Sequence, residues 1–166
     1  MQEGKAGAVL PEPGEDAHKF IEDFGVYFAQ GGSTRMYGRV LALLLIAPEP
    51  GLSTSQLRES LGASKGAISS ATRVLEQIGF VERFHVRGSR ETFFRVKPGV
   101  WSDMIVSKSH YLTRVKEMAE EALNIKELTP EAVDKLEELR DVHAFFANAF
   151  MGLVERWEEE KGRDRK

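Results

Sequence analysis

The sequence from residue 64 to residue 84, SKGAISSATRVLEQIGFVERF, constrains the fold more than any other stretch of the chain. Ser64 can cap a helix and Gly79 can end it, and the residues between them follow helical spacing. The apolar positions fall on one side of that helix, which must be buried: Ile68, Ala71, Leu75 and Ile78. The opposite side carries small or polar residues and one long cation: Gly66, Ser69, Ser70, Arg73 and Gln77. A helix with so little bulk on its outer side can approach another large body closely.

The segments on either side of this helix complete a short series of elements. Ser53-Thr-Ser-Gln56 is typical of a capping box that starts a short helix ending at Gly62. After residue 79, FVERFHV and ETFFRV flank the tip RGSR at residues 87–90, which predicts a two-stranded hairpin. The order helix, short turn, helix, hairpin predicts a winged helix-turn-helix, whose second helix enters the major groove of DNA.

The rest of the chain is expected to be mainly helical. Helices are predicted over residues 16–30, over a second segment capped by Ser33 and running through Ala47, from residue 98 to about 128, and over 130–161. The fold class is therefore mainly α with a small β-hairpin wing. The predicted organisation is a flexible arm (1–14), an N-terminal helix joining the dimerisation region (15–32), a winged helix-turn-helix DNA-binding domain (33–99), a helical dimerisation region (100–161) and a charged tail (162–166).

Charge is distributed unevenly along the chain. The net charge is −3, yet residues 33–97 hold 10 basic and 5 acidic side chains, a net +5 between two acidic segments. This pattern favours a segment that faces phosphates, with chance scatter as the alternative. There are no cysteines, which excludes disulfides and thiol catalysis. The longest apolar run, residues 40–47, is too short to span a bilayer, and we expect a cytoplasmic protein.

The outer face of residues 64–77 and the hairpin tip are the candidate DNA contacts. Arg73 can reach guanine O6 and N7, and serine hydroxyls can bond base edges or phosphates. Arg87 and Arg90 project from the tip as a wing would, although such tips also occur as ordinary solvated turns. A low-charge exposed helix is the alternative for the helical part. The full candidate set is Ser64, Lys65, Gly66, Ser69, Ser70, Arg73, Gln77, Arg87, Ser89 and Arg90.

A family resemblance accompanies these residues. TSQLRESLGASKGAISSATRVLEQIGFVERF followed by RGSRETFFRV resembles the winged helix-turn-helix of MarR-type bacterial transcription factors, and residues 18–101 are most similar to the GbsR-like subgroup. The resemblance implies a homodimeric DNA-binding regulator, with a small effector bound between the winged and helical parts in many members. One departure is Ser89, where many MarR-type wings carry an aspartate before the arginine. The role of Arg90 is therefore the least determined.

Two aromatic-rich helices suggest a partner of the chain's own kind. The last predicted helix has a broad apolar stripe, and the first has an aromatic stripe, more than one winged domain can cover. We expect a two-fold homodimer, with an intramolecular bundle in a monomer as the alternative. The candidate dimerisation residues are Phe20, Phe145, Phe146, Phe150, Leu153 and Trp157.

No constellation of catalytic groups stands out, and we expect neither an enzyme nor a cofactor or metal site. Some aromatic residues could line an effector cavity, with core packing as the alternative: Phe24, Tyr27, Phe28, His110 and Tyr111. Two functions stay open at this point. One is a sequence-specific regulator of duplex DNA, with repression as the expected mode, and the other is a winged-helix protein-interaction module without specific DNA binding.

Overall fold

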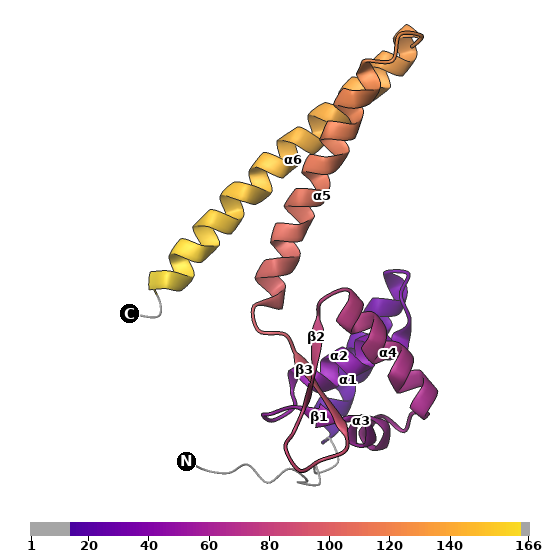
Figure 1. Cartoon of the computed structure of the whole chain (residues 1–166), viewed down its shortest axis with the longest axis vertical. Coiled ribbons are helices and arrows are strands. Elements are labelled where there is room, and N and C mark those ends of the chain that lie inside the picture. Colours follow the sequence, from indigo (N-terminus) through magenta and orange to yellow (C-terminus); the bar gives the residue numbers. More distant parts are fainter. Residues whose placement is uncertain (1–13, 164–166) are drawn as a thin grey trace. The chain divides into compact units, whose positions relative to one another are not determined.

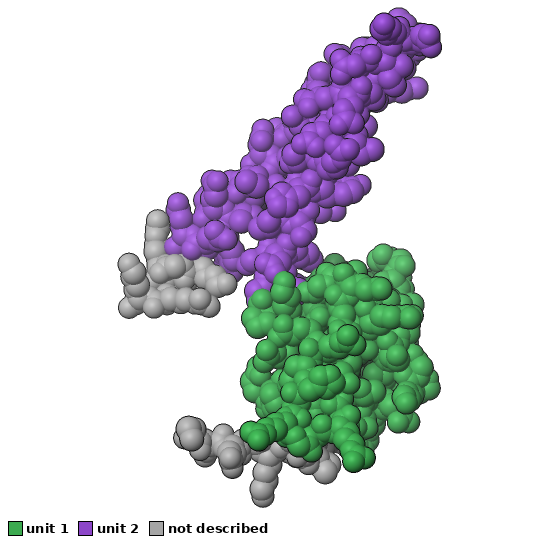
Figure 2. All heavy atoms as spheres, viewed as in Figure 1, with its two compact units in different colours: residues 1–98 green, residues 99–166 purple. Residues whose placement is uncertain are grey.

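The computed structural model describes residues 14–163, and the predicted arm over residues 1–14 lies almost entirely outside them, as does the end of the charged tail. The chain forms two compact units, residues 1–98 and residues 99–166, coloured green and purple in Figure 2. The elements of the first unit are α1 (Glu15–Gln30), α2 (Arg35–Leu45), β1 (Leu52–Ser53), α3 (Thr54–Leu61), α4 (Lys65–Gln77), β2 (Val81–His85) and β3 (Thr92–Val96). The second unit holds α5 (Val100–Leu123) and α6 (Pro130–Arg163), shown in Figure 1.

The sheet of the first unit is small and antiparallel. Its strand order is β1-β3-β2, so the hairpin of β2 and β3 is the predicted wing and β1 adds an edge that the sequence did not predict. The register pairs Leu52 with Phe94 and Val81 with Val96. The prediction of a mainly α fold with a hairpin wing is therefore confirmed, with one extra strand of two residues.

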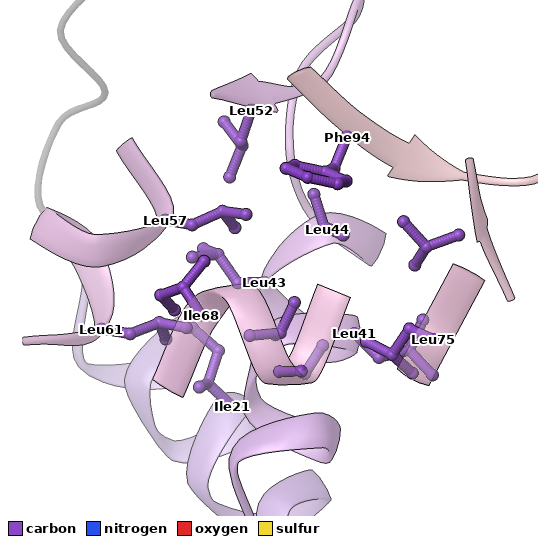
Figure 3. Close-up of a cluster of buried hydrophobic side chains, with 14 residues drawn as sticks. Ile21, Leu41, Leu43, Leu44, Leu52, Leu57, Leu61, Ile68, Leu75 and Phe94 are labelled. Atoms are coloured by element: carbon purple, nitrogen blue, oxygen red, sulfur yellow. The ribbon is translucent and has the colours of Figure 1, made fainter. Parts of the chain in front are cut away.

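One hydrophobic core holds the first unit together. Leu41 of α2, Leu57 of α3 and Leu75 of α4 are fully buried, and Figure 3 shows these side chains converging. Phe94 covers the same cluster from β3. Because each element of the unit places apolar side chains in this one core, α3, the turn after it and α4 are held on a single scaffold.

Several expected details differ in the structure. Ser33 does not cap α2, because Thr34 is the N-cap residue and makes no side-chain cap hydrogen bond. The helix ends at Leu45 rather than at Ala47. Ile78, expected on the buried side of α4, is 55% exposed, because it lies at the C-cap where the helix ends. Thr72, which was not expected in the core, is buried, and its hydroxyl donates to the Ile68 carbonyl at 3.0 Å.

The second unit is a hairpin of two long helices. Ser109 of α5 and Ala147 of α6 are both buried, and the Ser109 hydroxyl donates to the Ala147 carbonyl at 3.4 Å. Thr129 accepts a hydrogen bond from the Ala132 amide at 3.3 Å, so the predicted cap before Pro130 is present. The long helix expected from residue 98 to about 128 is α5, which is shorter at both ends.

Candidate nucleic-acid interface

Side-chain caps set the geometry of the helix-turn-helix. In α3 the Ser53 hydroxyl accepts from the Gln56 amide at 3.2 Å, and the Gln56 side chain accepts from the Ser53 amide at 2.8 Å. The predicted capping box is therefore confirmed. Gly62 takes a left-handed conformation, φ 57°, which ends α3 and turns the chain. The Ser64 hydroxyl then accepts from the Ala67 amide at 3.2 Å and caps α4.

The two sides of α4 differ as the sequence predicted, apart from Ile78. Ile68, Ala71 and Leu75 are fully buried against the core. The other side is solvent-facing, with Ser70 half-buried at its border. The exposed residues of this face, which we call the α4 outer face, are Ser64, Lys65, Gly66, Ser69, Arg73 and Gln77. Apart from Gln77 and the two cations Lys65 and Arg73, its side chains are short, and such a face suits close approach to a helix-sized groove.

The tip end of the wing is attached to the helix-turn-helix by a side-chain hydrogen bond. The Ser89 amide donates to the Val86 carbonyl at 3.0 Å, and Gly88 has φ +86°, which forms the turn. The Ser55 hydroxyl of α3 donates a short hydrogen bond to the Glu91 carboxylate. Hydrogen bonds from Ser55 and then Ser53 hold the pKa of Glu91 below its ordinary value. An acidic residue therefore does fix this hairpin, but it follows Arg90 in the sequence and contacts α3.

Ion pairing separates the cations of the basic segment into two groups. Arg35 and Arg39 pair with Glu22, Arg83 lies 3.4 Å from Glu76, and Arg95 lies 2.6 Å from Glu82. Among the residues that the structure describes, the cations of this segment with no ion-pair partner are Arg58, Lys65, Arg73, Arg87 and Arg90. Four of them are predicted DNA contacts. The fifth, Arg58, is exposed on α3 and was not among the predicted contacts, because nothing in the spacing of α3 distinguishes it.

The expected effector residues fall in different units. Phe24, Tyr27 and Phe28 form a ring cluster on α1, with neighbouring centroids 5.4–6.4 Å apart, and Tyr27 is 69% exposed. His110 and Tyr111 lie exposed on α5 of the second unit. A cavity of about 350 Å³ lies between α5 and α6 and is lined by other residues: Trp101, Ser102, Ile105, Phe150, Leu153, Val154 and Trp157.

The candidate dimerisation residues are largely accessible in the single chain. On α6, Phe145 is 69% and Phe146 48% exposed, and their rings meet edge to face at 5.4 Å. Leu153, Trp157 and, on α1, Phe20 are also exposed, while Phe150 is half-buried. Trp157 donates from its indole nitrogen to the Ser102 hydroxyl at 3.3 Å, which joins the C-terminal part of α6 to the start of α5.

Two further properties concern the described part of the chain alone. Within residues 14–163, no helix combines the length and the apolar character that crossing a membrane requires. Over the same residues, no three or more His, Asp or Glu side chains gather as a metal site would need.

Comparison with known proteins gives consistent matches. The MarR family matches residues 37–90, and the family described as MmpR5-like MarR family transcriptional regulator matches residues 99–160. The HTH-type transcriptional regulator MmpR5 of Mycobacterium tuberculosis is 31% identical over 150 residues, which cover 90% of this chain and 91% of that protein. A crystal structure of a transcriptional regulator is also 31% identical, with a TM-score of 0.74, covering 87% of this chain and 99% of the other. The Staphylococcus aureus MepR–DNA complex is 15% identical with a TM-score of 0.41.

Proposed function

Because the chain belongs to the MarR family of transcriptional regulators, which bind DNA rather than catalyse reactions, we propose that it reads duplex DNA through the α4 outer face. Arg73 reads a base edge, the serines and Gln77 add hydrogen bonds to bases or phosphates, and Lys65 contacts phosphate. Arg87 and Arg90 of the wing contact the backbone beside it, and Ser89 shapes the wing turn.

The observation that carries this proposal is the lack of ion-pair partners on this surface. Within the described residues, Arg73, Arg87 and Arg90 form no ion pair, whereas Arg83 of β2 and Arg95 of β3 do. An unpaired, hydrated cation can exchange its counterion for a phosphate or a guanine without first breaking an internal salt bridge. The protein-interaction alternative has less support, because the α4 outer face has no large apolar side chain.

The same proposal includes a homodimeric repressor that works in the cytoplasm. The exposed apolar side of α6 supports dimerisation, since a single chain leaves Phe145 and Trp157 in water. Two copies would present two α4 helices to half-sites about one helical turn apart. The proposal also includes release by a small effector and membership of the GbsR-like subgroup. Both rest on the family resemblance of residues 18–101 alone.

Selection of bound duplexes from a random library, followed by sequencing, tests the proposal. The full chain should enrich one motif, and Arg73→Ala should lose about 1–3 kcal/mol of affinity for it and relax preference at one base position. Arg83→Ala is the control, because Arg83 is an exposed cation already paired with Glu76. Failure of the wild type to enrich any motif would refute specific binding. Equal loss on selected and scrambled duplexes would place Arg73 on phosphate.

The wing is expected to supply affinity more than specificity. Replacing Arg87 and Arg90 by alanine removes up to four phosphate contacts in a dimer, so the slope of log K against log salt should become shallower by as much as about 3.6. The ranking of variant duplexes should stay the same. Titration of binding against salt concentration measures the slope, with Arg95→Ala, paired to Glu82, as the control. An unchanged slope means that the wing does not touch DNA, and a changed ranking means that it reads a groove.

A further inference from the structure

Helices α1 and α2 cross in direct backbone contact. A Cβ atom on Gly38 would lie 2.5 Å from the Phe24 carbonyl oxygen and 2.8 Å from the Gly25 Cα, so only glycine fits at this crossing. A Cβ atom on Gly25 would in turn lie 2.8 Å from the Arg39 Cγ and 3.0 Å from the Arg35 Cγ. The missing side chains at the crossing therefore leave room for two arginine stems of α2 to lie across α1.

Both of these arginines reach one carboxylate of α1. The Arg39 Nε donates to Glu22 Oε1 at 2.7 Å, and the Arg35 guanidinium donates to Glu22 Oε2 at 2.6 Å. The Arg39 side chain is only 22% exposed, whereas that of Arg35 is 57% exposed. Water screens the inner pair less than the outer one, so Glu22 holds the Arg39 guanidinium in a defined orientation.

The far end of the Arg39 guanidinium contacts the helix-turn-helix. Its Nη2 donates to the Leu61 carbonyl at 3.1 Å. Leu61 is the last residue of α3, and the three residues that follow turn the chain into the cap of α4. The last carbonyls of a helix carry partial negative charge, which favours a cation there. One side chain thus joins the crossing of α1 and α2 to the point from which α4 projects.

We infer that Arg39, oriented by Glu22, is a positioning residue for the DNA-contacting helix. The inference rests on the proposed function, since the placement of α4 matters only if α4 reads DNA. Hydrogen bonds to base edges weaken steeply when the donor shifts or tilts. Long cations on phosphates tolerate such a shift, because their contacts are less directional. Loss of the Arg39 contact should therefore weaken specific binding and leave binding to unrelated DNA intact.

Arg39→Gln in the full chain tests this, with the duplex that the wild type selects and a scrambled duplex of the same composition. The affinity for the selected duplex should fall about tenfold, while the affinity for the scrambled duplex and the salt slope stay unchanged. Arg35→Gln is the matched control, because Arg35 pairs with the same Glu22 but donates no hydrogen bond to Leu61. It should leave both affinities at the wild-type values.

Two other measurements separate positioning from a direct contact or a general loss of structure. If Arg39 acts through α4, its effect should largely disappear in the Arg73→Ala background, because coupled residues are not additive. Glu22→Gln keeps the Arg39 side chain and should lower the affinity for the selected duplex by a smaller factor. This variant replaces Arg39→Gln in the test if Arg39→Gln does not fold.

Four outcomes would each overturn the inference. Two concern the size of the effect: additive losses of affinity in the double variant, or unchanged affinity in a folded Arg39→Gln. The other two are an equal fall in affinity for both duplexes and a salt slope that becomes shallower by about 1.8 in a dimer. These outcomes presuppose that the wild type selects a motif. Its failure to select one refutes the proposed function instead, so the two failures are distinguishable.

Discussion

Helices α4 and α6 turn opposite kinds of surface to the solvent. The α4 outer face is small and polar with two unpaired cations, Lys65 and Arg73, while its inner side is fully buried. One solvent-facing side of α6 carries large apolar residues, and Ala147, which faces α5, is the one buried residue of α6 among those described. Water covers the first surface readily, whereas apolar surface costs about 25 cal/mol for each Å² left in water. The first surface suits a charged, hydrated partner, and the second requires an apolar one.

The largest expected effect comes from placing a charge on the apolar side of α6. Phe146→Glu should convert a dimer to single chains, because burial of one phenylalanine in each copy contributes about 3–6 kcal/mol per dimer. Asn148→Glu is the matched control, because it introduces the same glutamate two positions along the chain from Phe146, about 200° around the helix. Light scattering at low micromolar concentration should give 18.6 kDa for the first variant and twice that mass for the control and the wild type. A wild type at the mass of one chain would rule out the dimer.

The inner side of α4 gives the next largest effect. Leu75→Ala should lower the free energy of unfolding by about 2–5 kcal/mol, because it leaves a cavity in the core of the first unit. Ile78→Ala, in the next turn, should change it by no more than about 0.5 kcal/mol, since Ile78 is exposed. Urea unfolding of the two variants measures the difference. Similar losses would mean that Ile78 is covered in solution, and therefore that a partner reaches the end of α4.

Local patterns in the sequence were sufficient to predict most of the fold. The spacing of Ile68, Ala71 and Leu75 gives the buried side of α4, because helical periodicity acts within a few residues. It failed at Ile78, where the helix ends and the periodicity no longer applies. Thr72 was missed because its burial depends on a hydrogen bond to its own helix, which a hydropathy pattern does not reveal. The strand β1 is too short for any periodicity to predict it.

Only the solvent-facing residues of the candidate site could be predicted from the sequence. The composition of the α4 outer face and the arginines of the wing are visible in the sequence, because exposure follows from helix and turn geometry. The contacts behind that surface join residues far apart: Arg39 meets Glu22 and Leu61 across 17 and 22 positions, and Ser55 meets Glu91 across 36. Such pairs depend on how the helices cross, which a single sequence does not specify.

A small gain in stability separates what α4 needs for folding from what it needs for binding. Gly66→Ala should raise the free energy of unfolding by about 0.5–1 kcal/mol, because glycine costs conformational entropy within a helix. The added Cβ would meet only the Ser64 hydroxyl at 4.0 Å, so the free protein accommodates it.

The same methyl group should weaken binding to the selected duplex several-fold, because it fills the surface at which α4 approaches DNA. Gly152→Ala on α6, where a Cβ meets nothing within 4 Å, is the control. It should raise the melting temperature to a similar extent and leave DNA binding unchanged. Thermal unfolding and binding isotherms on the two variants provide the comparison. If Gly66→Ala binds the selected duplex as tightly as the wild type does, α4 does not approach DNA closely at Gly66, and the small size of that residue serves no purpose in recognition.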